Sequence, residues 1–291
     1  MLNELNHPFI VGTMRFGKWG ANLSAREYEY FIDGCLDLGL SCFDHADIYG
    51  AYSTEEEFGQ VIKKRPQLKN KIQIITKCGI RYVSENRKEH KIKSYDTSSG
   101  HIRASLERSL LNLGIDSIDL LLIHRPDHLM DPEEIADTIS ELKKEGKLKA
   151  FGVSNFSCQE FDLLNNLTPL SSNQIEFSLV QRKALEDGTL TQCMQHKIRP
   201  TIWSPLGGGV LFKKSCSEAL DKVLYEIGEK YGLNKQQVLL KWIMTHPSAP
   251  LPVLGTTKIE RLKEALDSAD TRMKREEWYE LLEAASGQEV A

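Results

Sequence analysis

Titratable residues follow each of several apolar runs in the first half of the chain. These residues are Asp44, Tyr49, Lys77 and His124. A carboxylate, a phenol, an ammonium and an imidazole can exchange protons with a bound molecule when a fold brings them together. If the apolar runs are parallel strands of one barrel, all of these side chains meet at the C-terminal mouth of that barrel.

The apolar runs alternate with stretches of helical period, which predicts parallel strands joined by helices. Strands are expected at residues 10–14, 38–43, 72–76, 118–123, 148–153, 173–177, 200–203 and 251–254. No Pro/Gly/Ser-rich linker or shift in composition divides the sequence. We therefore expect one domain over residues 1–291, a (β/α)8 TIM barrel in the α/β class.

Several helix starts are marked by a capping box, in which Ser or Thr stands three residues before Glu. The pairs are Ser24 with Glu27, Thr54 with Glu57, Ser157 with Glu160, and Thr257 with Glu260. Asp131 followed by Pro132 marks another start.

Residues 80–100 break the alternation of strands and helices, because they are charged and almost free of periodic apolar residues. A segment of this kind is either a functional lid over the mouth or a solvated tether.

The composition argues against several classes of protein. The 291 residues are 41% hydrophobic with a formal net charge of −4, which favours neither nucleic-acid nor membrane-surface binding. The N-terminal residues lack a signal-peptide pattern, and no apolar run approaches the ~20 residues of a membrane span. A cytoplasmic location and a monomer are the expectations, since nothing marks a surface for self-association.

The cysteines are scattered, with no Cys-x-x-Cys, so neither a zinc site nor a redox pair is expected. They are Cys35, Cys42, Cys78, Cys158, Cys193 and Cys216. Most are expected to be small buried hydrophobes. Cys78 could be reactive, because Lys77 beside it would stabilise a thiolate, but packing is the favoured interpretation.

A set of motifs, each at an expected strand end, resembles the bacterial NADP-dependent oxidoreductases of the aldo-keto reductase superfamily over nearly the whole chain. The motifs lie at residues 43–50, 76–77, 122–126, 152–156, 173–174, 203–209 and 255–258. One such fragment would mean little, but their joint occurrence in this order is a strong signal. The resemblance implies a tetrad of Asp44, Tyr49, Lys77 and His124 that reduces an aldehyde or ketone to an alcohol with NADPH.

The chemistry of these residue types agrees with that role. A carbonyl that receives a hydride needs a proton on its oxygen, and a phenol donates well only if its pKa falls from ~10 towards neutrality. Lys77 is expected to lower the pKa of Tyr49, with Asp44 holding the ammonium. A neutral His124 could orient the carbonyl. Taken singly, these residues are typical of a rim aromatic, a strand-end cation, a turn acid and a structural histidine; together they favour catalysis. His45 is interpreted as packing and Asp47 as supporting the loop.

The resemblance also places residues around the NADP(H) cofactor. They are Ser154, Asn155, Gln174, Trp203, Ser204, Leu206, Gly207, Gly208, Gly209, Gly255, Thr256, Thr257, Lys258, Arg261 and Glu264. The first three would hold the carboxamide and Trp203 would stack on the nicotinamide. The glycine loop and the helix start near Thr257 would take the phosphates, with Arg261 at the 2′-phosphate. The chain departs from the family at Gly255, where many reductases carry Lys, and at Ala265, where many carry Asn.

The carbonyl substrate itself is not readable from the sequence. The residues nominated to frame it are Trp19, Tyr52, Tyr82 and Arg125. Arg125 could receive an acidic substrate or pair with a neighbouring acid.

Two other functions remain open. One is a nucleotide-binding sensor or accessory subunit with little turnover, as the potassium-channel β subunits resemble reductases. The other is a metal-dependent hydrolase, for which His45-Ala46-Asp47 is a poor ligand pattern.

Overall fold

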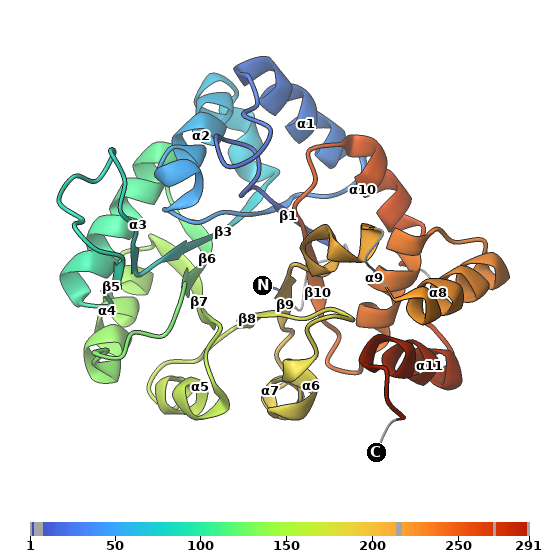
Figure 1. The fold of residues 1–291 in the computed structure, drawn as a ribbon. Helices are drawn as coiled ribbons and strands as arrows, with labels where there is room; N and C mark the ends of the chain where they lie inside the picture. Colours follow the sequence, from blue (N-terminus) through green and yellow to red (C-terminus); the bar gives the residue numbers. More distant parts are fainter. Residues whose placement is uncertain (1, 3–7, 214–216, 270–271, 290–291) are drawn as a thin grey trace.

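The computed structural model describes residues 2, 8–213, 217–269 and 272–289, so Cys216 lies outside the described residues. Parallel strands close into a barrel in the order β1-β10-β9-β8-β7-β6-β3-β2 (Figure 1). Their bounds are β1 (Ile10–Gly12), β2 (Cys42–Asp44), β3 (Gln73–Cys78), β6 (Ile118–Ile123), β7 (Leu148–Ser154), β8 (Asn173–Glu176), β9 (Thr201–Trp203) and β10 (Leu251–Leu254). The expected (β/α)8 architecture is confirmed, with strand limits shifted by a few residues.

The barrel strands are buried almost throughout, which is why they appear in the sequence as continuous apolar runs. Inside the ring, side chains from alternate positions form a core. This inner core includes Ile10, Cys42, Ile75, Leu120, Leu122, Leu251 and Val253. Larger apolar clusters fill the space between the strands and the outer helices. The strand ends are thereby held rigidly, and side chains placed there keep fixed positions.

The helices surround the barrel (Figure 1). They are α1 (Ala25–Asp37), α2 (Thr54–Lys64), α3 (Ser99–Leu113), α4 (Pro132–Lys144), α5 (Cys158–Asn165), α6 (Lys183–Glu186), α7 (Thr189–Gln195), α8 (Glu218–Tyr231), α9 (Lys235–Thr245), α10 (Ile259–Leu266) and α11 (Arg275–Ser286). No helix in the described ranges combines the length and apolar character needed to cross a bilayer.

The predicted capping boxes at Ser24 and Ser157 are confirmed, as is the cap at Asp131. The boxes predicted at Thr54 and Thr257 are wrong. Helix α2 begins one residue earlier, so Thr54 lies inside its first turn with a buried hydroxyl, and α10 begins one residue later, after Lys258. Neither α2 nor α10 has a side-chain hydrogen bond at its cap residue.

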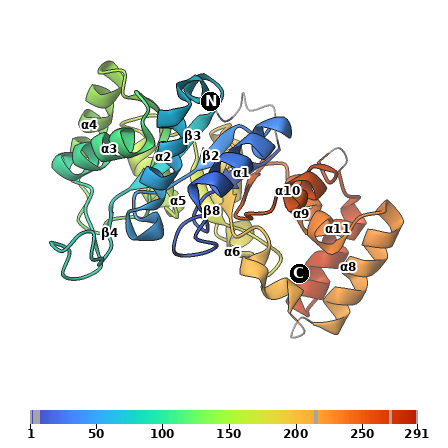
Figure 2. The same cartoon turned by 90° about the horizontal axis from the view of Figure 1, so that it is seen from above.

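Residues 80–95 form an ordered hairpin rather than a solvated tether. Two short strands, β4 (Ile80–Arg81) and β5 (Ser94–Tyr95), pair antiparallel outside the barrel. The side chains of Ile80 and Tyr82 join an apolar cluster that also contains Tyr49. Figure 2 shows this hairpin and the loop after β1 on one side of the molecule, with the N-terminus on the opposite side.

Candidate active site

The structure brings the expected tetrad together at the C-terminal mouth. Asp44 ends β2, Lys77 lies near the end of β3, and His124 directly follows β6. The ammonium of Lys77 donates to both carboxylate oxygens of Asp44 at 2.8 Å and to the carbonyl oxygen of His45 at 2.7 Å. The same Nζ lies 3.2 Å from the hydroxyl of Tyr49. The phenol and the ammonium therefore share one site.

Burial and charge act in opposite directions on Lys77, which is only 1% exposed beside the 3% exposed Asp44. Burial favours the neutral amine, whereas the Asp44 carboxylate and the Tyr49 oxygen favour the ammonium, and the result is a raised pKa. The hydrogen bonds from Lys77 reach both oxygens of Asp44, so the buried pair is well compensated. Lys77 is therefore a permanent cation at physiological pH.

The expectation that Lys77 brings the pKa of Tyr49 towards neutrality is not met. Burial of the phenol raises its pKa above the ordinary value and is the largest effect. The Lys77 ammonium opposes this, while the Asp44 carboxylate adds to it. Tyr49 therefore keeps its proton across the neutral range, which is the state that a proton donor needs.

His124 is half-buried, and its ring lies edge-on to the Tyr49 ring with centroids 6.1 Å apart. Burial lowers the pKa of its imidazole far below the usual value, and the positive charges of Lys77 and Arg125 lower it further. The Nδ1 atom is buried without a hydrogen-bond partner among the described residues. A neutral imidazole is thus fixed beside the phenol.

His45 and Asp47 lie behind the tetrad rather than in it. His45 is fully buried against Phe58, with ring centroids 4.5 Å apart, and its Nδ1 lies 3.0 Å from the Thr13 hydroxyl. That hydroxyl donates to the carbonyl oxygen of Asp44, so it accepts the proton of His45 Nδ1. Burial raises the pKa of Asp47, and the nearby Glu55 carboxylate raises it further. No cluster suited to a metal ion occurs among the residues that the structure describes.

The strand ends on the far side of the mouth carry a connected set of polar groups. The amide Nε2 of Gln174 donates to Asp44 Oδ1 at 3.0 Å, a bond that links β8 to β2. The hydroxyl of Ser154 donates to the carbonyl oxygen of Gln174, and Asn155 Nδ2 donates to that hydroxyl. The indole of Trp203 then donates to Asn155 Oδ1 at 3.0 Å. The sequence motifs indicated these residues but gave no sign of the Gln174–Asp44 bond.

The loop after β9 exposes its backbone towards the same side. Gly207, Gly208 and Gly209 have φ of 60°, 62° and 89°, which glycine adopts at little cost. A Cβ atom placed on Gly208, Gly209 or Gly255 would meet no atom within 4 Å, so a ligand can approach the backbone there. Leu206 anchors this loop in the core beneath, and Ser204 accepts from Gly207 N.

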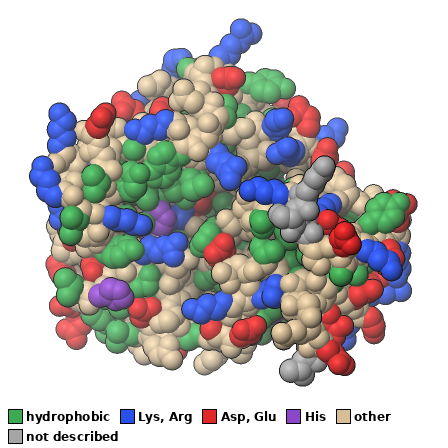
Figure 3. Space-filling view, in the orientation of Figure 1, with side chains coloured by type: hydrophobic (Ala, Val, Ile, Leu, Met, Phe, Trp, Pro, Cys, Tyr) green, Lys and Arg blue, Asp and Glu red, His purple; other side chains and the backbone are tan. Residues whose placement is uncertain are grey.

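At the start of α10, Lys258 and Arg261 are exposed, and their charged groups have no ion-pair partner among the described residues. The hydroxyl of Thr256 accepts from Lys258 N, and Thr257 is partly buried beside it. Figure 3 shows Lys and Arg side chains gathered between α10 and a hollow near the barrel axis. An open glycine backbone next to free cations fits a dinucleotide phosphate.

Two further residues of α10 contact other parts of the protein. The carboxylate of Glu264 accepts a hydrogen bond from Asn234 at the start of α9, and its carbonyl oxygen accepts from Gln237. Ala265 is fully buried in the apolar cluster under α10. The position where many reductases carry Asn is therefore used for packing in this chain.

The nominated substrate residues divide into two groups. Trp19 lies edge-on to Tyr49 and to Tyr82, with ring centroids 6.3 Å and 5.4 Å apart. Across the mouth, the guanidinium of Arg125 lies 5.6 Å from the centre of the Trp203 ring. Tyr52 is different, because its hydroxyl accepts a hydrogen bond from the backbone N–H of Tyr82 at 2.8 Å. This hydroxyl is therefore already hydrogen-bonded within the protein.

The chain matches the family model described as "Aldo/keto reductase family" over residues 8–286. Oxidoreductase YdhF of Escherichia coli is 43% identical over 97% of this chain and 94% of its own length. A 6-dehydroglucose reductase of Agrobacterium fabrum is 40% identical over 97% and 95%. The solved thermostable aldo-keto reductase Tm1743 superposes with a TM-score of 0.78 at 25% identity, covering 96% of this chain and 94% of its own.

The chain belongs to the aldo/keto reductase family.

The family inferred from the motifs is thus confirmed. Aldo/keto reductases are oxidoreductases of carbonyl groups that use NADP(H), and the present reductase is one of them.

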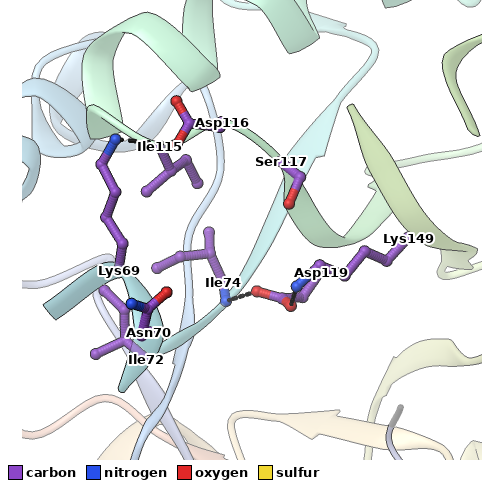
Figure 4. Close-up of a pocket in the computed structure, with 9 residues that line it drawn as sticks. All are labelled: Lys69, Asn70, Ile72, Ile74, Ile115, Asp116, Ser117, Asp119 and Lys149. Atoms are coloured by element: carbon purple, nitrogen blue, oxygen red, sulfur yellow. Dashed lines mark hydrogen bonds and ion pairs between the residues drawn. The ribbon is translucent and has the colours of Figure 1, made fainter. Parts of the chain in front are cut away.

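A cavity of about 150 Å³ lies at the other end of the barrel, at the N-terminal ends of β3, β6 and β7 (Figure 4). Its charged groups already pair with one another, Lys149 with Asp119 and Lys69 with Asp116. That cavity belongs to the closed end of the barrel and not to the reductase site.

Proposed function

We propose that this reductase converts an aldehyde or ketone to an alcohol with Tyr49 as the proton donor. The observation that carries the proposal is the 3.2 Å distance between the Tyr49 hydroxyl and Lys77 Nζ, inside a mouth that also holds Asp44 and His124. The proposal keeps all members of the tetrad, with the pKa of Tyr49 raised rather than lowered.

Each side chain has a distinct task in that reaction. The bound NADPH supplies the hydride that the carbonyl carbon receives. The proton on the Tyr49 oxygen moves to the carbonyl oxygen, and the O–H bond of the phenol breaks as the O–H bond of the alcohol forms. Lys77 stabilises the phenolate that remains, Asp44 fixes the ammonium, and solvent returns a proton to Tyr49. His124, neutral because of its lowered pKa, orients the carbonyl.

The cofactor is proposed to lie along the polar residues of β7, β8 and β9. Ser154, Asn155 and Gln174 would contact the carboxamide, and Trp203 would lie against the ring. The glycines of the loop after β9 would approach the pyrophosphate, and Thr256, Lys258 and Arg261 would contact the 2′-phosphate. Support comes from the open backbone at Gly208 and Gly255 and from Lys258 and Arg261, which form no ion pair with the residues that the structure describes.

The substrate side is proposed to be framed by Trp19, Tyr82 and Arg125. Aromatic rings on one side and a guanidinium on the other suit a small polar carbonyl compound. Two relatives are named 6-dehydroglucose reductase, so a sugar aldehyde belongs in any panel of substrates. Anionic carbonyl compounds should be included because of Arg125.

The test of the catalytic assignment is NADPH oxidation over a panel of aldehydes and ketones, with wild type and Tyr49→Phe compared. We expect kcat to fall about 100-fold or more in Tyr49→Phe, with NADPH binding by fluorescence unchanged. Tyr30→Phe is the matched control, because this tyrosine is 69% exposed on α1. Undiminished turnover in Tyr49→Phe would remove the residue from its role. NADPH binding by wild type without turnover on any carbonyl would favour the sensor function.

The NADP assignment is tested by dissociation constants for NADPH and NADH. Arg261→Ala should weaken NADPH about 10-fold or more and leave NADH unchanged, because only NADPH carries the 2′-phosphate. Lys263→Ala, an exposed cation on the same helix, is the control. Equal affinity for both dinucleotides, unaffected by Arg261→Ala, would defeat the assignment.

A further inference from the structure

The residues directly after Tyr49 adopt an unusual backbone conformation. Gly50, Ala51 and Tyr52 have φ of 60°, 55° and 75°, so a left-handed turn links Tyr49 to the start of α2. Glycine enters this region freely, whereas alanine and tyrosine do so only when surrounding contacts hold them. A side chain at Gly50 would also come within 2.5 Å of the Thr54 hydroxyl. The turn therefore depends on its neighbours for its shape.

The contacts that hold the turn come from the hairpin of residues 80–95. The amide of Asn86 donates to the carbonyl oxygen of Ala51 at 2.9 Å, and the hydroxyl of Ser84 donates to the same oxygen at 3.3 Å. The backbone N–H of Tyr82 donates to the hydroxyl of Tyr52 at 2.8 Å. Segments that are about thirty residues apart in the sequence thus meet at this turn.

The phenol of Tyr52 is the centre of this contact. Its hydroxyl donates to the carbonyl oxygen of Tyr82 at 3.3 Å and lies 3.3 Å from His90 Nδ1. The guanidinium of Arg87 covers its ring, 4.5 Å from the centroid. The polar atom of Tyr52 is therefore bonded by the hairpin on several sides.

The turn reaches Tyr49 along two routes. The carbonyl oxygen of Tyr49 accepts from Tyr52 N at 3.1 Å and from Ser53 N at 3.2 Å, so the turn fixes the Tyr49 backbone. On the ring side, Trp19 contacts both Tyr49 and Tyr82. A shift of the hairpin would therefore move the Tyr49 hydroxyl relative to Lys77.

We propose that Tyr52 is a positioning residue for the reaction. Its hydroxyl accepts a hydrogen bond from Tyr82 of the hairpin, which joins the hairpin to the left-handed turn. This contact keeps the Tyr49 oxygen beside Lys77. The inference rests on the proposed function, since it takes Tyr49 as the proton donor. The hairpin then acts as part of the catalytic framework, and its contact with Tyr52 sets how well the proton is delivered.

The experiment compares wild type with Tyr52→Phe, which removes one oxygen and keeps the ring under Arg87. We expect kcat to fall about 10-fold, because a small displacement of a reacting group slows the chemical step. The NADPH dissociation constant should stay within about twofold, and the solvent deuterium isotope effect on kcat should rise. Tyr95→Phe is the matched control, since Tyr95 is on the same hairpin, 37% exposed, and should keep wild-type kcat.

A double variant separates positioning from a general structural role. In the Tyr49→Phe background the donor is gone, so adding Tyr52→Phe should cause no further loss of the residual rate. Asn86→Ala removes the hydrogen bond from the Asn86 amide to the carbonyl oxygen of Ala51 and should lower kcat in the same way. This variant provides the test if Tyr52→Phe fails to fold.

The outcomes are distinct. Wild-type kcat in Tyr52→Phe overturns the inference, as does a rise in the KM of the carbonyl substrate with kcat unchanged, which would make Tyr52 a substrate contact. A full additional loss in the double variant also overturns it. These results leave the proposed function standing, because that function fails only if Tyr49→Phe retains turnover or if wild type binds NADPH and turns over no carbonyl.

Discussion

Lys77 shows how a single charged side chain can be kept at the centre of a barrel mouth. Its ammonium is almost completely buried, yet the Asp44 oxygens and the His45 carbonyl oxygen accept its hydrogen bonds. Such a pair is stable as a whole and unstable when one partner is lost, because the remaining charge has neither water nor a counter-ion.

Lys77→Met should therefore reduce both activity and stability. We expect the free energy of unfolding to fall by about 3–5 kcal/mol in urea titrations, because Asp44 is left as an uncompensated buried carboxylate. The kcat should drop about 100-fold or more. Lys64→Met makes the same change in the exposed pair with Glu29 and should cost about 1 kcal/mol or less. An equal loss in both variants would contradict the description of Lys77 as a compensated buried charge.

His45 predicts a pH dependence of stability. Burial, followed by the charge of Lys77, lowers the pKa of its imidazole to about 3 in the folded protein, from a usual value near 6.5. Between these values the unfolded chain binds a proton that the folded chain does not. The contribution of the neutral His45 to the free energy of unfolding is therefore fully present above about pH 6.5, and it is lost as the pH falls towards 3.

His45→Asn should remove that contribution, because an amide can keep the hydrogen bond to Thr13 without titrating. The stability of wild type should decline relative to the variant by about 1.4 kcal/mol for each pH unit below 6.5. Thermal midpoints between pH 7 and pH 4 measure the difference. His128→Asn, on an exposed loop, should follow wild type. Parallel curves for wild type and His45→Asn would show that the imidazole takes up its proton at the same pH in the folded and the unfolded protein.

At the scale of elements, α11 is held to the barrel by a reciprocal contact with α9. The indole rings of Trp242 and Trp278 stack at 4.9 Å with planes 7° apart. Each indole N–H donates to the backbone carbonyl oxygen of the other residue, at 3.0 Å and 2.9 Å. Because both rings and both N–H groups are used, this contact fixes the register of one helix against the other.

Trp278→Ala should consequently destabilise the protein by about 3 kcal/mol or more, since it opens a cavity and leaves the Trp242 ring without its partner. The kcat at 25 °C should stay near wild type, because none of the residues proposed for the reaction lies on α11. Tyr225→Ala, at a position 67% exposed on α8, should change stability by about 0.5 kcal/mol or less. A kcat that falls in proportion to stability would show that α11 supports the active site directly.

At the scale of the whole molecule, the two ends of the barrel carry different kinds of residues. The mouth gathers the residues that we propose to react, whereas polar groups at the opposite end pair with one another (Figure 4). There Asp119 of β6 accepts from Ile74 N of β3 and from Lys149 of β7, both at 2.8 Å, and so ties three strands together.

Asp119→Ala should lower the free energy of unfolding by about 1–3 kcal/mol, because the N–H of Ile74 loses its acceptor. The kcat and KM should remain at wild-type values, since the change lies at the far end of the barrel. Asp116→Ala, in the same cavity but with a 90% exposed side chain, should have almost no effect on stability. A change in KM for Asp119→Ala would show that the two ends are coupled.

The amino-acid sequence by itself determined the barrel, because buried strands, helical stripes and polar strand ends are local patterns with fixed periods. It also indicated the residues that we propose as the tetrad, since Asp44, Lys77 and His124 each stand where an apolar run ends. Two of the capping boxes were placed one residue away from the observed helix start, because a Thr–x–x–Glu pattern does not fix the backbone angles that precede a helix.

Only the tertiary structure decided what depends on distances between remote segments. The bond between Gln174 and Asp44, the raised pKa of Tyr49 and the tie between Tyr52 and the hairpin all require groups far apart in the chain. Burial, which outweighs the effect of Lys77 on the Tyr49 phenol, is a property of the packed mouth as a whole. Residue types identify which groups can react, and the packed fold sets their protonation and their neighbours.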